Sequence, residues 1–247
     1  MKIRLQFFFP LALLIVAGCS PKEPVTAAGT TGTTPEAAAT NGADPSAPVK
    51  PLDRSLIPED LKNDAYEYFG LGNDKPMDMQ VVISSDPGVK TGTVSTTLTE
   101  VKDGKATFTI ERSGGLMQLG TQKVTLQKEG IYVSESTDAV LESPQLELSS
   151  NLAPGSSWSS KLKVDKPGSK MELSTSYTVK GVEKFKTAKG QREGLLVVAK
   201  GSGTANGEPI TFESREWYVK GVGGVKAVLV TKTKAGQGQT ITIEESK

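Results

Sequence analysis

Apolar and polar side chains alternate with a period of two over most of the chain beyond residue 52, and turn residues recur about every eight to twelve positions. This pattern is typical of strands in antiparallel sheets, which bury one face and expose the other. Sustained helical periodicity is absent from this part of the sequence, which disfavours parallel α/β folds. The sequence therefore predicts an all-β domain, an antiparallel curved sheet or half-barrel, over residues 52–247. The clearest run places five residues on one strand face: Met171, Leu173, Thr175, Tyr177 and Val179.

Residue pairs that favour tight turns separate the expected strands. Asp-Gly and Asn-Gly suit two-residue hairpin loops because these residues tolerate positive φ angles. We therefore expect a hairpin from Thr93 to Arg112 around Asp103-Gly104. One or two helical turns are expected between Pro58 and Tyr68. The other expected turns are Asp86-Pro87-Gly88, Pro167-Gly168 and Asn206-Gly207.

A weak internal repeat divides this part into two similar halves of about 85 residues. Phe69-Gly70-Leu71-Gly72 aligns with Leu152-Ala153-Pro154-Gly155, and Ile131-Tyr132-Val133 aligns with Trp217-Tyr218-Val219. Two such halves predict either one continuous curved sheet or two stacked sheets. The alternative is that any two β-rich stretches align this well.

The first residues have the layout of a secretory leader. The basic residues Lys2 and Arg4 precede an apolar run from Phe7 to Ala17, and Gly18 stands directly before Cys19. This run is about half as long as a helix that crosses a bilayer. We therefore predict that residues 1–18 are a signal peptide that is removed.

The stretch from Ile15 to Cys19 resembles the lipobox of bacterial lipoproteins. In that family the cysteine thiol receives a diacylglyceryl group, and the cysteine becomes the new N-terminus. Because Cys19 is the only cysteine, the resemblance implies that it carries palmitate-type acyl chains that hold the protein on a membrane. The sorting rule of the family implies the outer membrane for Ser20, if the organism has two membranes. The alternative is a lone cysteine near an ordinary cleavage site.

A low-complexity stretch follows the cysteine, and residues 19–51 are predicted to form a lipidated tether. Ala, Thr, Pro, Gly and Ser dominate from Ser20 to Pro51, and such a composition cannot bury enough apolar surface to become ordered. As a flexible chain it reaches about 30 Å. A spacer that holds the domain off the bilayer is expected, rather than a recognition motif.

Composition excludes several classes of function. The chain has 29 Lys and Arg against 28 Asp and Glu, a net charge of +1, and nucleic-acid binding requires a larger basic surplus. With no histidine and one cysteine, it lacks the parts for Ser-His-Asp and Cys-His catalysis, haem and multi-Cys zinc sites. Asp74 and Asp78 lack the dense acidic loop that calcium requires. No metal and no cofactor is therefore predicted.

Three local motifs suggest chemistry but have simpler interpretations. The run from Gly221 to Lys226 is glycine-rich, yet no Ser or Thr follows the lysine, so a hairpin turn is expected instead of a phosphate loop. Ser160-Lys161-Leu162-Lys163 and Lys90-Thr91-Gly92 match elements of penicillin-recognising enzymes, but in reversed order. We interpret that match as coincidence.

A pair of carboxyl groups is the one set of catalytic residues that the composition does not exclude. Glu213 and Glu216 stand beside Trp217-Tyr218, where aromatic rings could contact a sugar. Strand residues three apart point to opposite faces, however, so surface acids beside core aromatics are the expected arrangement. Five aromatic residues could line an apolar cavity for a lipid or fill the core: Trp158, Tyr177, Phe212, Trp217 and Tyr218.

Two further segments carry a resemblance to a family. Leu152 to Trp158, which contains a PGxxW pattern, and Trp217 to Lys226, which resembles a WYxxGVGxVK hairpin, are similar to segments of uncharacterised exported bacterial lipoproteins. The resemblance implies a fold related to the half-barrels of Lol-type lipoprotein carriers. It implies no activity and no functional residue.

These observations predict an envelope lipoprotein with a membrane anchor on Cys19, and no enzyme. The leading hypothesis is a binding or assembly module that presents a cavity or a sheet edge to a lipid, glycan or protein partner. One alternative is a carboxylate-dependent hydrolase of envelope polysaccharide, and another is a purely structural spacer. The sequence identifies no catalytic residue and no ligand-binding residue.

Overall fold

The protein is described from a computed structural model that covers residues 51–247, with gaps at residues 138–140, 142, 167–168, 235 and 237. The predicted leader, Cys19 and all but the last residue of the predicted tether lie outside the described residues, as does the expected turn at Pro167-Gly168. Among the described residues, no helix is long and apolar enough to span a bilayer.

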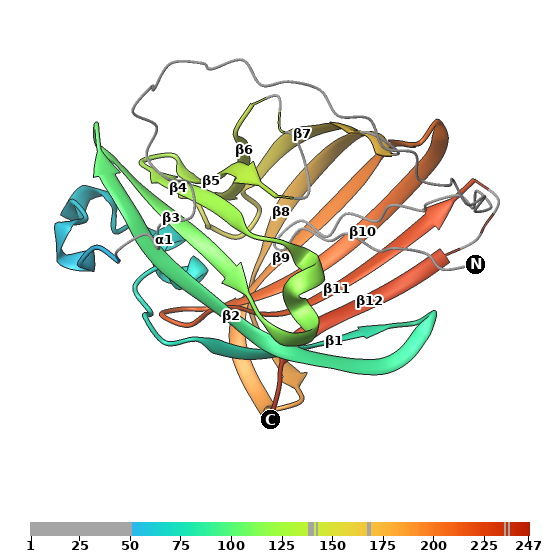
Figure 1. Ribbon diagram of the computed structural model, residues 1–247, viewed down its shortest axis with the longest axis horizontal. Helices are drawn as coiled ribbons and strands as arrows, with labels where there is room; N and C mark the ends of the chain where they lie inside the picture. The colour runs from blue at the N-terminus through green and yellow to red at the C-terminus, as the bar shows by residue number, and fades with distance from the viewer. Residues whose placement is uncertain (1–50, 138–140, 142, 167–168, 235, 237) are drawn as a thin grey trace, which may run out of the picture.

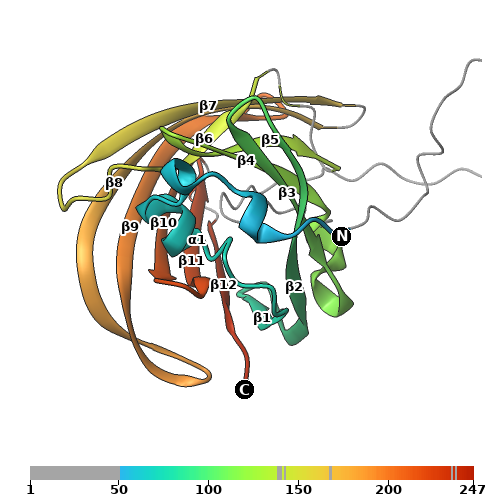
Figure 2. The ribbon, with the colours of Figure 1, turned by 90° about the vertical axis from the view of Figure 1, so that its left-hand side faces the viewer.

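Twelve antiparallel strands form one sheet that curls into a barrel (Figures 1 and 2). The order across the sheet is β6-β5-β4-β3-β2-β1-β12-β11-β10-β9-β8-β7. The strands are β1 (Met77–Ile83), β2 (Asp86–Lys102), β3 (Lys105–Arg112), β4 (Gln122–Gln127), β5 (Gly130–Ser136), β6 (Gln145–Ser149), β7 (Ser157–Lys166), β8 (Ser169–Thr187), β9 (Gly190–Ala205), β10 (Glu208–Val219), β11 (Gly223–Thr233) and β12 (Gly238–Glu245). The predicted all-β, antiparallel curved sheet is confirmed.

The two edge strands, β6 and β7, come into contact where the barrel nearly closes. Strand pairing joins every other neighbouring pair, but in the described part of the chain none joins β6 to β7. We call this line of contact the seam. No strand pairing therefore closes the barrel there, and the two edges are joined by side-chain contacts and by the chain connection of residues 150–156.

The sheet consists of two consecutive six-stranded meanders, β1–β6 and β7–β12, which are joined where β1 pairs with β12. The first pair of segments aligned in the predicted repeat, Phe69–Gly72 and Leu152–Gly155, precedes the first strand of each meander. The second pair lies in β5 and in β10. These are the fifth strand of one meander and the fourth of the other, so the second pair of aligned segments does not lie in equivalent strands.

Alternation of side chains fixes which face of each strand is buried. On β8, Leu173, Thr175 and Tyr177 are buried, while Ser174 and Ser176 between them are exposed. The β2–β3 hairpin forms as predicted from Thr93 to Arg112, since Val94 pairs with Arg112 and Lys102 with Lys105. Its turn uses positive φ angles of 50° at Asp103 and 67° at Gly104, as a tight two-residue loop requires.

Short helices cover one mouth of the barrel (Figure 2). They are η1 (Arg54–Leu56), η2 (Glu59–Leu61) and α1 (Asp64–Phe69), and a further helix, η3 (Gly114–Leu119), links β3 to β4. The Asn63 side chain caps α1 by accepting from the Tyr66 amide at 3.2 Å. The predicted helical segment from Pro58 to Tyr68 is thus confirmed. Gly70 ends α1 with φ 76°, and any side chain there would collide with the backbone of Val222.

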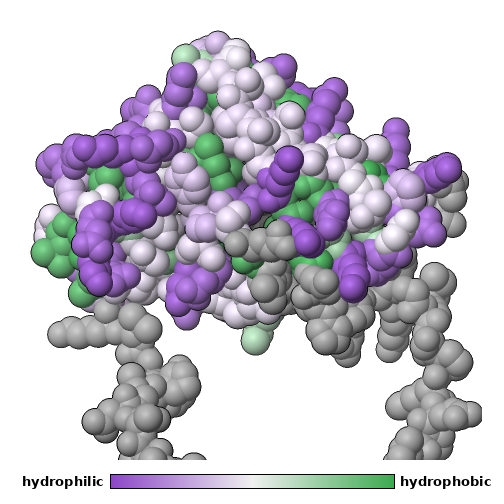
Figure 3. All heavy atoms as spheres, turned by 90° about the horizontal axis from the view of Figure 1, so that it is seen from above, coloured by the Kyte–Doolittle hydropathy of each residue, from purple (hydrophilic) through white to green (hydrophobic). Residues whose placement is uncertain are grey.

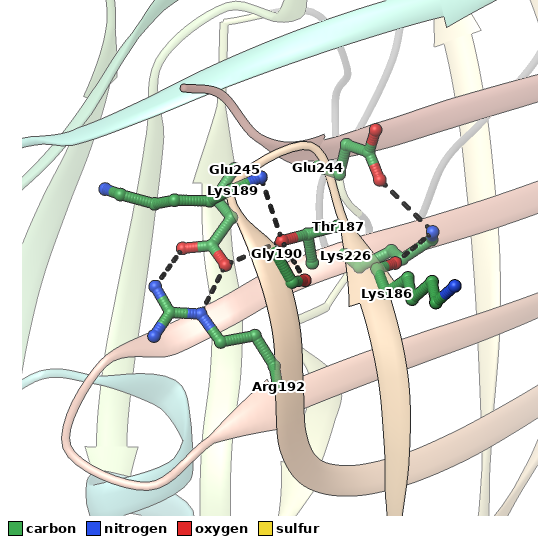
Figure 4. Close-up of polar contacts among 8 residues, drawn as sticks. All are labelled: Lys186, Thr187, Lys189, Gly190, Arg192, Lys226, Glu244 and Glu245. Atoms are coloured by element: carbon green, nitrogen blue, oxygen red, sulfur yellow. Dashed lines mark hydrogen bonds and ion pairs between the residues drawn. The ribbon is translucent and has the colours of Figure 1, made fainter.

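The ends of β8 and β9 extend beyond the barrel wall as an arm, residues 183–194, that folds over the outside of β10–β12 (Figures 2 and 4). A register shift between Val179 and Gly181 turns the arm away from the sheet. Phe185 of the arm stacks on Trp217 with ring centres 5.5 Å apart. Arg192 binds both carboxylate oxygens of Glu245, at 2.6 and 2.8 Å. The arm is therefore fixed by an apolar cluster and by an ion pair.

The barrel interior holds the main core, which is built from Leu, Ile, Val and aromatic side chains of nearly every strand. The second, smaller cluster lies under the arm and contains Phe185, Leu196, Trp217 and Val225. Apolar side chains on the face shown in Figure 3 lie in small areas separated by hydrophilic ones. The site described next interrupts the apolar interior.

Candidate ligand chamber at the seam

Five buried side-chain polar atoms have no hydrogen-bond partner among the described residues, and all five lie on strands near the seam. Buried polar groups are almost always hydrogen-bonded, because an unpaired one costs free energy. Their gathering in one region makes the seam the candidate functional site. The atoms are Gln122 Nε2 (β4), Glu147 Oε1 (β6), Trp158 Nε1 (β7), Thr175 Oγ1 and Tyr177 OH (β8).

Three of these residues line one small cavity, which we call the chamber. Its free volume is about 20 Å³, enough for one water molecule or one functional group of that size. Strands from both sides of the seam contribute to it. The chamber is lined by Gln122, Val133, Leu141, Gln145, Glu147, Ser160, Leu162 and Tyr177.

A β-bulge places Glu147 inside the barrel. Ile131 of β5 pairs with Leu148, whereas the next residue, Tyr132, pairs with Leu146. Glu147 is therefore the extra residue in β6, and it is buried together with its neighbour Leu148. Without the bulge, consecutive residues would face opposite sides of the sheet.

A second buried carboxyl group, Glu216 of β10, belongs to the same interior. Tyr218 OH donates to one of its oxygens at 2.7 Å, and Ser214 Oγ donates to the other at 2.8 Å. Glu147 and Glu216 are each only 3% exposed. The two carboxyl groups thus lie in a region almost closed to solvent.

Burial raises the pKa of both carboxyl groups. Removal from water raises the pKa of Glu216 to about 7, even though the hydrogen bonds from Tyr218 and Ser214 favour its charged form. Desolvation raises the pKa of Glu147 well above its ordinary value, and the negative charge of Glu216 raises it further. Burial, followed by the charges of Glu147 and Glu216, likewise raises the pKa of Tyr177, whereas a contact with the side chain of Ser160, which also lines the chamber, lowers it. The chamber therefore favours neutral side chains.

Arg112 orients the amide of Gln122. Its guanidinium donates to Gln122 Oε1 at 2.7 Å and to the Gly120 carbonyl at 2.9 Å. Because Oε1 is engaged by this donor, the amide nitrogen is the end that faces the chamber. Gln122 thus presents a donor there.

A second pocket, of about 60 Å³, lies at the mouth that α1 covers. Arg112, which binds Gln122, and Tyr218, which donates to Glu216, both line this pocket. Its other lining residues are mainly apolar: Phe69, Gly70, Asn73, Lys75, Met77, Val94, Thr96, Ile110, Val222, Gly223 and Gly224.

The structure separates the two acids that the sequence singled out. Glu213 is exposed and pairs with Lys200 at 3.4 Å, as expected for a surface acid. Glu216 faces the interior, so its interpretation as a surface acid is wrong. Its acidic neighbour is Glu147, which the sequence analysis did not identify. The alternation of β10 could have predicted its burial, because Glu216 lies an even number of residues from Phe212 and Tyr218 and therefore faces the same side of the strand.

Four of the five aromatic residues considered for a cavity belong to the interior core. Trp158 packs flat on Tyr177, with ring centres 5.0 Å apart and planes 4° apart. Trp217 lies instead in the outer cluster, where its Nε1 donates to Glu183 at 2.9 Å. These four rings do not line the chamber as a set, since of them only Tyr177 borders it.

The remaining sequence motifs occupy ordinary structural positions. The glycine-rich run at Gly221 forms the predicted turn of the β10–β11 hairpin, with positive φ at Gly221 and Gly223. Ser160 lies in the middle of β7, and Lys90-Thr91-Gly92 lies in β2. In the described ranges, no three Cys, Asp or Glu residues gather as a metal site would require.

The fold defines the class of this protein: a twelve-stranded antiparallel barrel with an unpaired seam and a helix-covered mouth. It matches a protein of Bacteroides fragilis with a YmcC-like fold, which is named as exported, at a TM-score of 0.50 and 11% identity over 73% of this chain and 98% of that one. The fold is therefore YmcC-like.

Two further solved structures are similar at lower scores. One is from Parabacteroides distasonis and is named as a lipoprotein, with a TM-score of 0.49, 15% identity and coverage of 73% of this chain and 98% of that one. The other is the hypothetical lipoprotein YmcC of Escherichia coli, with a TM-score of 0.34, 10% identity and coverage of 70% and 84%. No protein-family model and no curated protein matches the sequence.

Proposed function

We propose that this protein is a lipid-anchored binding module of the bacterial cell envelope, and that the chamber at the seam is part of its ligand site. The leader and the lipobox-like stretch ending at Cys19 support export and anchoring. The names of the similar structures, as exported proteins or lipoproteins, agree with this location. Ser20 favours the outer membrane if the organism has two membranes.

The observation that carries the binding role is the gathering of unpartnered polar atoms at the seam. A protein that served only as a spacer would gain nothing from burying Glu147 and Tyr177 without partners, because apolar side chains of similar size would be more stable. Binding sites are the usual places where such a cost is retained. A ligand that satisfies these atoms would recover it.

The same geometry makes the alternative of a polysaccharide hydrolase weaker. A glycosidase needs two carboxyl groups that flank the scissile bond of a bound sugar chain. Glu147 and Glu216 are buried to 97%, and the space beside Glu147 holds about 20 Å³. A space of that size does not hold a sugar ring beside Glu147, so we infer that the domain binds its ligand without hydrolysing it.

The anchor is tested by mass spectrometry of the protein purified from its own membranes. The mature chain is expected to begin at Cys19 and to carry the added mass of acyl chains. Cys19→Ala is expected to abolish that mass. An unmodified thiol on an uncleaved chain would refute the anchor.

The ligand site is tested by native mass spectrometry of the same full-length lipoprotein. The wild type is expected to retain a non-covalent species that Tyr177→Phe loses, because the substitution removes one polar atom of the chamber. Tyr132→Phe serves as the matched control: Tyr132 lies between the buried residues Ile131 and Val133 and therefore faces the opposite side of β5. Equal retention by all three proteins, or none in the wild type, would refute the site.

A further inference from the structure

We propose that the chamber recognises a hydroxyl group, and hence that the ligand is a neutral sugar. This inference rests on the proposed function, because it assigns a ligand class to the same site. It follows from the donors and acceptors that the chamber offers, from its size and from the aromatic ring beside it.

The three unpartnered groups of the chamber match a hydroxyl group. Gln122 Nε2 can only donate, and its orientation is fixed by Arg112. The unpartnered Oε1 of Glu147 can accept, and Tyr177 OH can do either. A hydroxyl oxygen accepts from one neighbour while its hydrogen is donated to another, so one such group satisfies donors and acceptors together.

Charged groups fit less well. An ammonium group has three donors and no acceptor, so it would leave Gln122 Nε2 unpaired and would point a donor at a donor. A carboxylate or phosphate would face Glu147 and Glu216 in a region that is almost closed to water. Burial also raises the pKa of Glu147, because the surroundings disfavour charge there, and an uncharged ligand would add no further charge.

An acyl chain also fits poorly. It offers no hydrogen bond, and all the unpartnered polar atoms would keep their desolvation cost. The volume of about 20 Å³ admits one polar group rather than an alkyl chain. The rest of the ligand must therefore remain outside the chamber.

The seam beside the chamber offers a place for the rest of a sugar. Leu141 and Gln145, which line the chamber, are only partly buried. Trp158 is also partly exposed, and its ring is held flat against Tyr177. Its unpartnered Nε1 adds a further donor, so an apolar ring and a polar group stand together, as a sugar with both kinds of surface requires.

The test measures binding of defined probes to the full-length lipoprotein in a detergent without a sugar headgroup. Ligand-observed NMR is recorded with methyl glucoside, methyl mannoside, methyl galactoside and N-acetylglucosamine. Ethanolamine provides the ammonium comparison, and acetate provides the anionic one. The variants are Tyr177→Phe and the control Tyr132→Phe, and thermal unfolding verifies that each one folds.

At least one neutral sugar is expected to bind. Tyr177→Phe is expected to weaken that binding by about tenfold or more, since a site built for a hydroxyl group depends strongly on each polar partner. Tyr132→Phe should leave the affinity unchanged. Equal affinity in wild type and Tyr177→Phe would overturn the assignment to the chamber.

The other outcomes separate this inference from the proposed function. Binding of ethanolamine or acetate but of no sugar, with loss in Tyr177→Phe, would overturn the sugar and leave the binding module intact. If the wild type retains a bound molecule in native mass spectrometry and that molecule is not a sugar, the sugar is likewise overturned and the binding module remains. If no probe binds and no native species is retained, both proposals fail.

Discussion

Replacement of the buried carboxyl group of Glu216 by an amide is expected to change how the stability of the protein depends on pH. The folded state raises the pKa of this group from its ordinary 4.5 to about 7, mainly through desolvation. A raised carboxyl pKa means that folding disfavours the ionised form. The contribution of Glu216 to the free energy of unfolding should therefore fall as the pH rises from about 4.5 to 7, and this contribution should level off above that range.

The magnitude follows from the same two values. Each pH unit of this interval lowers the free energy of unfolding by about 1.4 kcal/mol. Through Glu216, the unfolding free energy of the wild type should therefore fall by about 3 kcal/mol between low pH and pH 8. Glu216→Gln cannot ionise and should not show this loss. Its amide keeps the size of the side chain, and it can still accept from Ser214 while it donates to the Tyr218 oxygen.

Urea unfolding at intervals between pH 4.5 and 8 measures the effect. Relative to the wild type, Glu216→Gln should gain about 3 kcal/mol of unfolding free energy between the two ends of the range. Glu213→Gln is the matched control, because Glu213 lies on the same strand but is exposed. A variant that follows the wild-type pH profile, or a control that departs from it by as much, would refute the assignment of a buried, costly charge to Glu216.

Two further predictions concern the arm. Trp217→Ala should lower the unfolding free energy by about 3 to 5 kcal/mol in urea titrations, since the indole is 6% exposed and packs on Phe185; a change below about 1 kcal/mol would contradict this packing. Arg192→Ala should speed amide hydrogen exchange in the arm tip at residues 186–193 while exchange in β10 stays unchanged, because the guanidinium and Thr187 both bind Glu245 there. Desolvation raises the pKa of Glu245, but the hydrogen bonds from Arg192 and Thr187 lower it overall. The contact should therefore weaken as the pH falls through that lowered pKa, so the protection of the tip, relative to the intrinsic exchange rate at each pH, should fall as well. Protection that does not change with pH would contradict the contact.

The strands and one hairpin could be predicted from the sequence because the evidence for them is local. The alternation from Met171 to Val179 survives in β8, and the turn at Asp103-Gly104 forms where its residues favour it. The position of Glu216 was within reach of the same argument, because it shares a strand face with Tyr218. The prediction of a surface acid relied on the charge of Glu216 and neglected the strand face on which it lies.

The chamber could not be predicted from the sequence because it depends on pairing between distant segments. Glu147 faces inward only because β6 bulges against β5, and the choice of the bulged residue depends on the partner strand. Gln122 faces the chamber because the guanidinium of Arg112 holds its oxygen. The two sides of the chamber meet only once β1 pairs with β12 and the sheet curls, and no local pattern encodes that closure.

The unpaired line between β6 and β7 also has a dynamic consequence. The two strands are consecutive, and a connection of residues 150–156 ties them together at one end. The barrel wall can therefore widen from the opposite end by moving side chains apart, while every backbone hydrogen bond between paired strands stays intact. Widening of the wall is a collective motion, and such motions take microseconds to milliseconds. Admission of a molecule to the interior by this route would require no local unfolding.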